Sequence, residues 1–234
     1  MSASARTSLA AVLLLAVCPS LARAEGPSFD CRKGRTPAEI AICRDPVLAH
    51  DDLRIARRYG VLMKGLGAVQ RVSLAADQAA FLRLRDTAAD GSDPGMYASI
   101  RSILGERAAF LDRIRLAPPK GLIGTWGSLE GEVEIRPADR GRLRLYGNIA
   151  DPYAARWTCE FDERGYVKSG VLGLQDGEEP IAFLDASRFG PFLEITQTDG
   201  KGQGVDSPSC GGWQSFANTY FYVGPVPDSE PEDR

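Results

Sequence analysis

FDCRKGRTPAEIAICRDPVLAHDDL, residues 29–53, holds two cysteines and two helix-start signals in close succession. TPAE (residues 36–39) has the pattern of a capping box, in which the threonine hydroxyl accepts a hydrogen bond from the glutamate N–H and the carboxylate accepts one in return. Pro37 suits the first helical position, because its missing N–H costs no hydrogen bond there. Asp45 followed by Pro46 repeats the signal. The stretch predicts a short helix that is followed at once by a longer one.

The residues after this stretch continue with helical periodicity. Ser73 is placed to cap a third helix, and Asp93-Pro94 is placed to cap a fourth. Apolar and long side chains recur at helical spacing in the last three segments: Leu48, Ile55, Tyr59, Leu62 and Leu66; Leu74, Gln78, Phe81, Leu82 and Arg85; and Tyr97, Ile100, Leu104, Ala108 and Leu111. Residues 29–116 are therefore predicted to form a small helical bundle.

The pattern changes at PPKG (residues 118–121) to short alternating runs separated by Gly, Asp and Pro. The runs are EVEIR (132–136), LRLY (143–146), WTCEF (157–161), GVLGL (170–174), IAFLD (181–185), FLEIT (192–196) and TYFYV (219–223). They predict about eight strands in an antiparallel barrel or sandwich. Gly124-Thr125-Trp126 resembles the G-x-W of lipocalin-type barrels. The expected fold class is α+β, with the helical bundle first.

The N-terminus has the features of a secretory signal peptide. A basic residue precedes the apolar run SLAAVLLLAVC (residues 8–18), which is too short to span a bilayer. The small-x-small pattern at residues 22–24 predicts cleavage before Glu25. A lipid anchor at Cys18 is disfavoured, because the residue before it is larger than a lipoprotein cleavage site accepts. We expect a periplasmic or secreted protein and not an integral membrane protein.

Removing Cys18 from the 5 cysteines leaves four, namely Cys31, Cys43, Cys159 and Cys210. An even number in an exported chain indicates two disulfides. Of the three pairings, we expect Cys31–Cys43 and Cys159–Cys210, because each pair lies within one half of the chain. Loop closure would give these bridges about 3 and about 4 kcal/mol of stability. Zinc is a weaker hypothesis, since the chain has no C-x-x-C motif and only one histidine, His50.

Charge is distributed unequally along the chain. Residues 25–117 carry 15 Lys+Arg and 12 Asp+Glu, a balance of +3, whereas residues 118–234 carry 11 and 19, a balance of −8. The asymmetry favours two units with different surfaces. The acidic second half argues against a nucleic-acid partner. No hydroxyl nucleophile can be given a histidine base except through His50, so we predict no catalytic residues, metal or cofactor.

The predicted organisation has five parts. They are a signal peptide (1–24), a helical unit (25–117), a linker (118–121), an antiparallel β unit (122–224) and a disordered acidic tail (225–234).

The helical unit resembles the LprI-type lysozyme inhibitor family over residues 28–116. The matching positions are Phe29-Asp30-Cys31, Thr36-Pro37-x-Glu39, Ile42-Cys43, Pro46, Leu48-Ala49, Asp52-Leu53, Tyr59, Gln78, Phe81-Leu82 and Arg85-Asp86. In that family the last group reads Q-x-x-W-L-x-x-R-D and leads into another cysteine. Here Phe81 replaces the tryptophan and no cysteine follows at Thr87, so the second disulfide of the family is absent.

The resemblance implies an exported protein that binds a lysozyme or related muramidase and occludes its cleft. Lysozyme clefts hold two carboxylates, which a basic side chain can pair with. Arg32, Lys33 and Arg35 in the stapled loop are the candidates for insertion, and the acidic half would steer the encounter with a cationic enzyme.

The alternative hypothesis is an envelope protein whose β barrel holds a lipid or other small apolar ligand. It depends on Trp126, Trp157 and Trp213, which are assigned to the barrel core but would also suit a ligand-lined barrel mouth.

Two further features are interpreted as structural. Glu130, Glu132 and Glu134 alternate and are assigned to the solvent face of a strand, not to paired acid–base catalysis. DGKGQGVD (199–206) places Lys201 where calcium needs an oxygen ligand, so it is interpreted as a hairpin loop.

Overall fold

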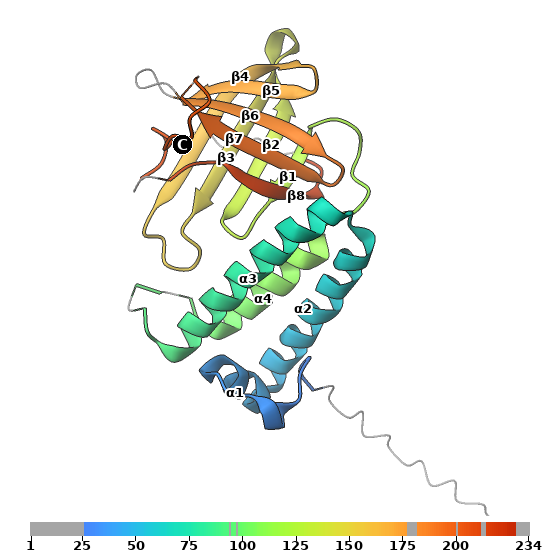
Figure 1. Ribbon diagram of the computed structural model, residues 1–234, viewed down its shortest axis with the longest axis vertical. Coiled ribbons are helices and arrows are strands. Elements are labelled where there is room, and N and C mark those ends of the chain that lie inside the picture. The colour runs from blue at the N-terminus through green and yellow to red at the C-terminus, as the bar shows by residue number, and fades with distance from the viewer. Residues whose placement is uncertain are drawn as a thin grey trace, which may run out of the picture.

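The computed structural model places a helical half below a β barrel (Figure 1). It describes residues 26–93, 95–96, 98–176, 182–199, 201–211 and 214–227. The predicted signal peptide, including Cys18, and residues 228–234 of the predicted acidic tail lie outside the described residues. Within the described residues, no helix is both long and apolar enough to cross a membrane.

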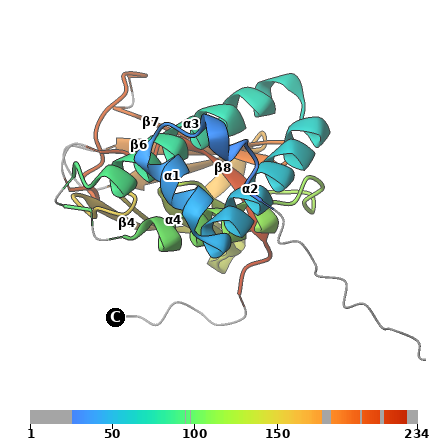
Figure 2. The same cartoon turned by 90° about the horizontal axis from the view of Figure 1, so that it is seen from below.

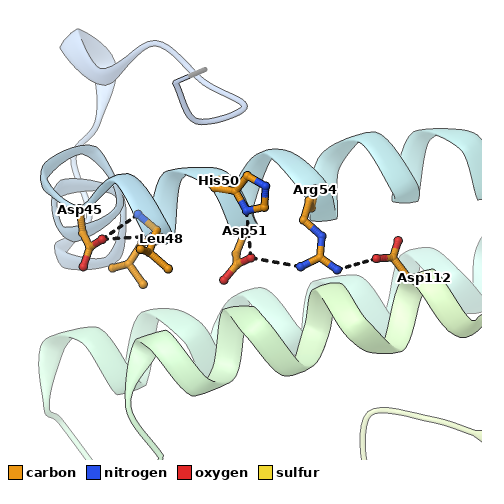
Figure 3. Close-up of polar contacts among 7 residues, drawn as sticks. Asp45, Leu48, His50, Asp51, Arg54 and Asp112 are labelled. Atoms are coloured by element: carbon orange, nitrogen blue, oxygen red, sulfur yellow. Dashed lines mark hydrogen bonds and ion pairs between the residues drawn. The ribbon is translucent and has the colours of Figure 1, made fainter. Parts of the chain in front are cut away.

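The helical half contains four α-helices after a short 3₁₀ turn. Their bounds are η1 (Cys31–Lys33), α1 (Pro37–Arg44), α2 (Pro46–Gly65), α3 (Ala68–Asp90) and α4 (Ile100–Arg113). The predicted capping box is confirmed, because the Thr36 hydroxyl accepts from the Glu39 N–H at 3.2 Å and Glu39 Oε2 accepts from the Thr36 N–H at 3.0 Å. Asp45 caps α2, because its side chain accepts hydrogen bonds from the N–H groups of Val47 and Leu48 (Figure 3). The first two helices therefore begin where local sequence places them.

The predicted starts of the last two helices are wrong. The chain re-enters a helix at Ala68, directly after Gly67, so Ser73 lies inside α3 and caps nothing. The fourth helix begins at Ile100, where Ser99 Oγ accepts from the Ser102 N–H at 3.2 Å. Asp93 closes a local turn instead, with Oδ1 accepting from the N–H two residues later at 2.9 Å. Pro94 and Tyr97, which belonged to the predicted fourth helix, lie outside the described residues.

The β half is a closed barrel in which every strand pairs antiparallel with the next and β8 returns to β1. The strands are β1 (Gly124–Gly127), β2 (Gly131–Pro137), β3 (Leu143–Ala150), β4 (Thr158–Lys168), β5 (Val171–Asp176), β6 (Ala182–Phe189), β7 (Phe192–Thr198) and β8 (Asn218–Gly224). Of the two predicted architectures, the barrel is therefore correct. Closure leaves no sheet edge open to pairing.

The barrel interior is filled by side chains. Residues no more than 2% exposed include Val133, Ile135, Leu145, Ile149, Phe161, Leu172, Leu184, Ala186, Leu193, Phe216 and Tyr220. Trp126 of the G-x-W motif is also fully buried, packs edge-on against Tyr222 at 5.2 Å, and donates from Nε1 to the Leu122 carbonyl at 2.9 Å. Trp157 packs at the border of this core, and Trp213 lies outside the described residues.

Both predicted disulfides are present. Cys31–Cys43 ties η1 to α1 and closes the loop at the N-terminus of the bundle. Cys159–Cys210 ties β4 to the segment that precedes β8. Each bridge lies within one half of the molecule, as the spacing of the cysteines indicated.

The two halves share a hydrophobic cluster, although the charge asymmetry suggested separate units. Phe192, Phe221 and Val223 point from the outer wall of the barrel into the core of the helical half. Phe221 packs edge-on against Phe110 of α4 at 6.2 Å and against Phe192 at 4.6 Å. Seen from the helical end, the helices lie across the barrel rather than beside it (Figure 2). This packing seats the helical half on β7 and β8.

Candidate functional site

The predicted partner-binding residues lie together at the tip of the helical half, at the end of the molecule opposite the barrel (Figure 1). Arg32 and Lys33 belong to η1, and Arg35 follows the glycine that ends it. We call residues 31–35 the stapled loop, because Cys31 is bonded to Cys43 of α1. Arg32, Lys33 and Arg35 therefore stay candidates for binding a partner, and the structure shows only where they lie.

Two of the three cationic side chains of the stapled loop, Arg32 and Arg35, are bound to groups of the loop or of the residue before it. Arg32 is 90% exposed and pairs with Asp30, with Nη2–Oδ2 at 2.8 Å and Nε–Oδ1 at 3.0 Å. The guanidinium lowers the pKa of the Asp30 carboxyl. Arg35 donates from Nη1 to the Gly34 carbonyl at 3.0 Å and to the Arg32 carbonyl at 3.2 Å. Lys33 is exposed, and no described residue pairs with it. The loop therefore presents one uncommitted ammonium beside an exposed guanidinium.

The backbone of the stapled loop is fixed from both ends. Glu39 Oε2 accepts from the Arg35 N–H at 2.7 Å as well as from the Thr36 N–H, and these bonds lower the pKa of Glu39. The disulfide fixes the other end. A loop that is ordered before binding loses little conformational entropy when a partner holds it.

A second cluster of charged groups lies where the helical half meets the barrel, and we call it the waist cluster. It comprises Asp77, Arg107, Glu130 and Asn218. Arg107 of α4 is fully buried and forms an ion pair with Asp77 of α3, with Nη2–Oδ1 at 2.5 Å. Asp77 Oδ2 also accepts from the Leu129 N–H at 3.2 Å, which ties the β1–β2 turn to α3. The buried ion pair thus joins two helices and the barrel.

The Arg107 guanidinium has further partners on the helices. Gln78 Oε1 accepts from Nε at 3.1 Å and from Nη2 at 2.8 Å. The rings of Phe81 and Phe110 lie on the guanidinium, with centroids 5.1 and 5.2 Å from its central carbon. Nη1 is buried without a hydrogen-bond partner in the described part of the chain.

Glu130 is the half-buried carboxyl of the waist cluster. Burial raises its pKa, a hydrogen bond from Asn218 Nδ2 at 2.8 Å opposes the rise, and repulsion from Asp77 and Asp151 adds to it. Hollows of about 590 and about 400 Å³ lie on either side of it. Glu130 thus lies in the turn before β2 and not on the strand itself, and it is half-buried because the helical half covers this end of the barrel.

The other two glutamates of the alternating series form separate ion pairs. Glu132 Oε1 lies 2.6 Å from Arg113 Nη1 of α4, and Glu134 Oε2 lies 2.7 Å from Arg136 Nη2. These contacts hold the carboxylates in structural roles at the barrel surface.

Replacing Glu130 by glutamine is expected to stabilise the protein near neutral pH and to have no effect in acid. A carboxyl whose pKa is raised in the folded state makes its full contribution to stability at pH values below its ordinary pKa of 4.5. This contribution to stability is lost as the pH rises through the raised pKa. Glutamine keeps an acceptor for Asn218 without the charge. The measurement is the Tm of both proteins over a pH series, with Glu163→Gln, a change at an exposed glutamate of β4, as the control. An unchanged Tm at every pH would contradict the burial of this charge.

His50 lies in a chain of ion pairs that connects α2 to α4 (Figure 3). Its ring is 68% exposed, with Nδ1 3.4 Å from Asp51 Oδ1. Arg54 continues the chain, with Nη1 3.3 Å from Asp51 Oδ1 and Nη2 2.6 Å from Asp112 Oδ2. These contacts place His50 on the surface of α2 at one end of the chain of ion pairs.

Asp199 and residues 201–206 of the predicted hairpin loop are described, and Gly200 lies outside the described residues. Asp199 Oδ1 accepts from the Lys201 N–H at 2.8 Å and from the Gln203 N–H at 3.1 Å, so this carboxylate is occupied by its own loop. Among the residues that the structure describes, no group of three or more His, Cys, Asp or Glu side chains could hold a metal ion.

Comparison of this chain with protein-family models, with curated proteins and with solved structures gives no match.

Proposed function

We propose that this protein is exported, that residues 28–116 form an LprI-type domain, and that this domain inhibits a lysozyme or related muramidase by occluding its cleft. The observation that carries the proposal is the stapled loop. It presents Lys33 and Arg32 to solvent on a backbone fixed by the Cys31–Cys43 disulfide and the capping box.

The chemistry of the loop suits a cleft that contains carboxylates. Glycosidic cleavage by lysozyme uses two acidic side chains, and an ammonium or guanidinium between them would pair with both. Lys33 is exposed and uncommitted, so binding breaks no internal ion pair at that position. The loop lies at the tip of the molecule, where the barrel does not obstruct a partner (Figure 1).

The barrel supports this proposal through its charge. Residues 118–234 have a balance of −8, from 11 Lys+Arg and 19 Asp+Glu. A negative field attracts a cationic enzyme and raises the association rate without contributing a contact. The alternative, a barrel that holds a small apolar ligand, has less support because side chains fill the barrel interior.

The triple substitution Arg32→Ala, Lys33→Ala and Arg35→Ala is expected to weaken inhibition by about tenfold or more, or at least about 1.4 kcal/mol. The measurement is residual muramidase activity on a cell-wall suspension, with residues 25–234 titrated against lysozymes of different structural classes. The charge-matched control replaces Lys120, Arg140 and Lys201, three exposed cations of the barrel half that lie outside the outer groove described below, by alanine.

Both triple variants make the protein more negative, so steering of a cationic enzyme cannot account for a loss of inhibition in either of them. Equal losses of inhibition would mean that the stapled loop makes no specific contact. If inhibition survives both sets of substitutions, the protein is an inhibitor but the stapled loop is not the part that enters the cleft. If no lysozyme is inhibited at micromolar excess, the proposed function is wrong.

A further inference from the structure

The outer wall of the barrel carries a groove on strands β4, β5 and β6, away from the helical half (Figure 1). We define the outer groove by Arg164, Tyr166, Lys168, Gly173, Phe183 and Asp185, which line a hollow of about 690 Å³. That volume lies within the range of pockets that bind small ligands, about 300–1,000 Å³.

The register of the strands explains the shape of the groove. Tyr166 is opposite Gly173, and Gly173 is opposite Asp185, so all three lie on the outer face. Phe183 lies two residues before Asp185 on the same face. Neighbouring strands are about 4.8 Å apart, so β4 and β6 stand about 10 Å apart with a glycine between them. The floor is therefore wide enough for one sugar ring.

The two aromatic side chains of the groove are unusually accessible. Tyr166 is 61% exposed and Phe183 is 39% exposed. Single exposed apolar residues are common on protein surfaces and need no explanation. Two of them on either side of one glycine, in one hollow, form a surface on which a flat ring with an apolar face can stack.

The charged groups of the groove include both signs. A β-carbon at Gly173 would lie 3.6 Å from Asp185 Oδ1, which places this carboxylate over the glycine floor. Within the described part of the chain, neither the Asp185 carboxylate nor the Lys168 ammonium has a hydrogen-bond or ion-pair partner. The groove therefore offers an acceptor at Asp185 and donors at Lys168 and Arg164.

We propose that the outer groove binds a saccharide. A pyranose ring has an apolar C–H face for the aromatic rings, and its hydroxyls both donate to a carboxylate and accept from an ammonium or guanidinium. A peptide strand has no sheet edge to pair with, because the barrel is closed. This site is independent of the stapled loop and of lysozyme inhibition.

The groove can be filled without disturbing the barrel. Gly173 has no positive φ, and an added β-carbon would make only an ordinary contact with Asp185 Oδ1. A phenylalanine at this position would occupy the floor and would also favour the strand. Gly173→Phe and Tyr166→Ala therefore remove the proposed site in opposite ways, by filling it and by removing its wall.

Isothermal titration calorimetry of residues 25–234 tests the proposal. The probes are chitotetraose and soluble glycan strands from amidase-treated peptidoglycan. We expect one of these probes or both to bind at a single site, and each variant to weaken binding by about tenfold or more. The control Phe189→Ala removes another exposed aromatic, at the end of β6, and is expected to leave binding unchanged.

Either of two outcomes would overturn the saccharide site. One is the absence of binding by the wild type at millimolar probe. The other is binding that persists in both Gly173→Phe and Tyr166→Ala while their Tm values match the wild type. Neither outcome affects the conclusion of the lysozyme assay, because that assay tests the stapled loop.

Discussion

Replacing Arg107 by methionine is expected to destabilise the protein by about 3–5 kcal/mol. The guanidinium is fully buried and pairs with Asp77, whose side chain is only 12% exposed. Removing the arginine leaves this carboxylate without its countercharge and leaves the Gln78 carbonyl without two donors. The measurement is urea unfolding, followed by far-UV circular dichroism.

The double variant Arg107→Met, Asp77→Asn separates the cost of an unpaired charge from the value of the ion pair. Asparagine retains an oxygen that can accept from the Leu129 N–H, so only the charge is lost. We expect the double variant to recover most of the stability, because a buried ion pair is worth little more than uncharged groups that fill the same space. Nη1 of the arginine, buried without a partner, weakens the pair further. If the effects of Arg107→Met and Asp77→Asn on stability are additive in the double variant, the two side chains have no coupling energy and the ion pair does not stabilise the packing of α3 against α4.

The parts of the fold that follow from sequence are those with local causes. The start of α1 depends on contacts between residues 35 and 39, and a capping box specifies them. The starts of α3 and α4 were predicted wrongly, since Ser73 and Asp93 have the chemistry of a cap but the chain turns elsewhere. Several residues can offer a cap, and the packing of the helices decides which one is used.

The alternating runs predicted the strands, but they did not predict that the sheet closes into a barrel. A barrel and a sandwich have the same inward and outward pattern, and the difference is the pairing of β1 with β8. Thr125 pairs with Gly224 across almost the whole β half, and no local signal encodes such a contact.

The basic cluster of the stapled loop was predictable because its residues are neighbours in sequence. The waist cluster was not, because its members come from α3, α4, the β1–β2 turn and β8. The sequence contained one sign that Arg107 is buried. Arg107 adjoins Ala108 and follows Leu104 by three positions, so its charge borders the apolar stripe of α4. A charged side chain at such a border is often solvated, but here the ion pair with Asp77 of α3 keeps it buried.

Phe221→Ala is expected to cost about 3–5 kcal/mol and to uncouple the two halves of the protein. The ring is fully buried between Phe110 of the helical half and Phe192 of the barrel. Its removal leaves a cavity at the point where the hydrophobic cluster crosses from one half to the other. The wild type is expected to unfold in one transition, because the halves share this cluster.

Two spectroscopic signals can follow the halves separately. All three tryptophans, Trp126, Trp157 and Trp213, belong to residues 118–234, so fluorescence reports the barrel, whereas the helical signal in circular dichroism reports the bundle. In the wild type the two curves should coincide, and in Phe221→Ala they should separate. The control is Phe161→Ala, a similarly buried ring that contacts Phe216 inside the barrel at 5.5 Å. It should lower stability without affecting the junction. Coincident curves in Phe221→Ala would mean that the remaining contacts, such as the Asp77–Arg107 pair, suffice to couple the halves.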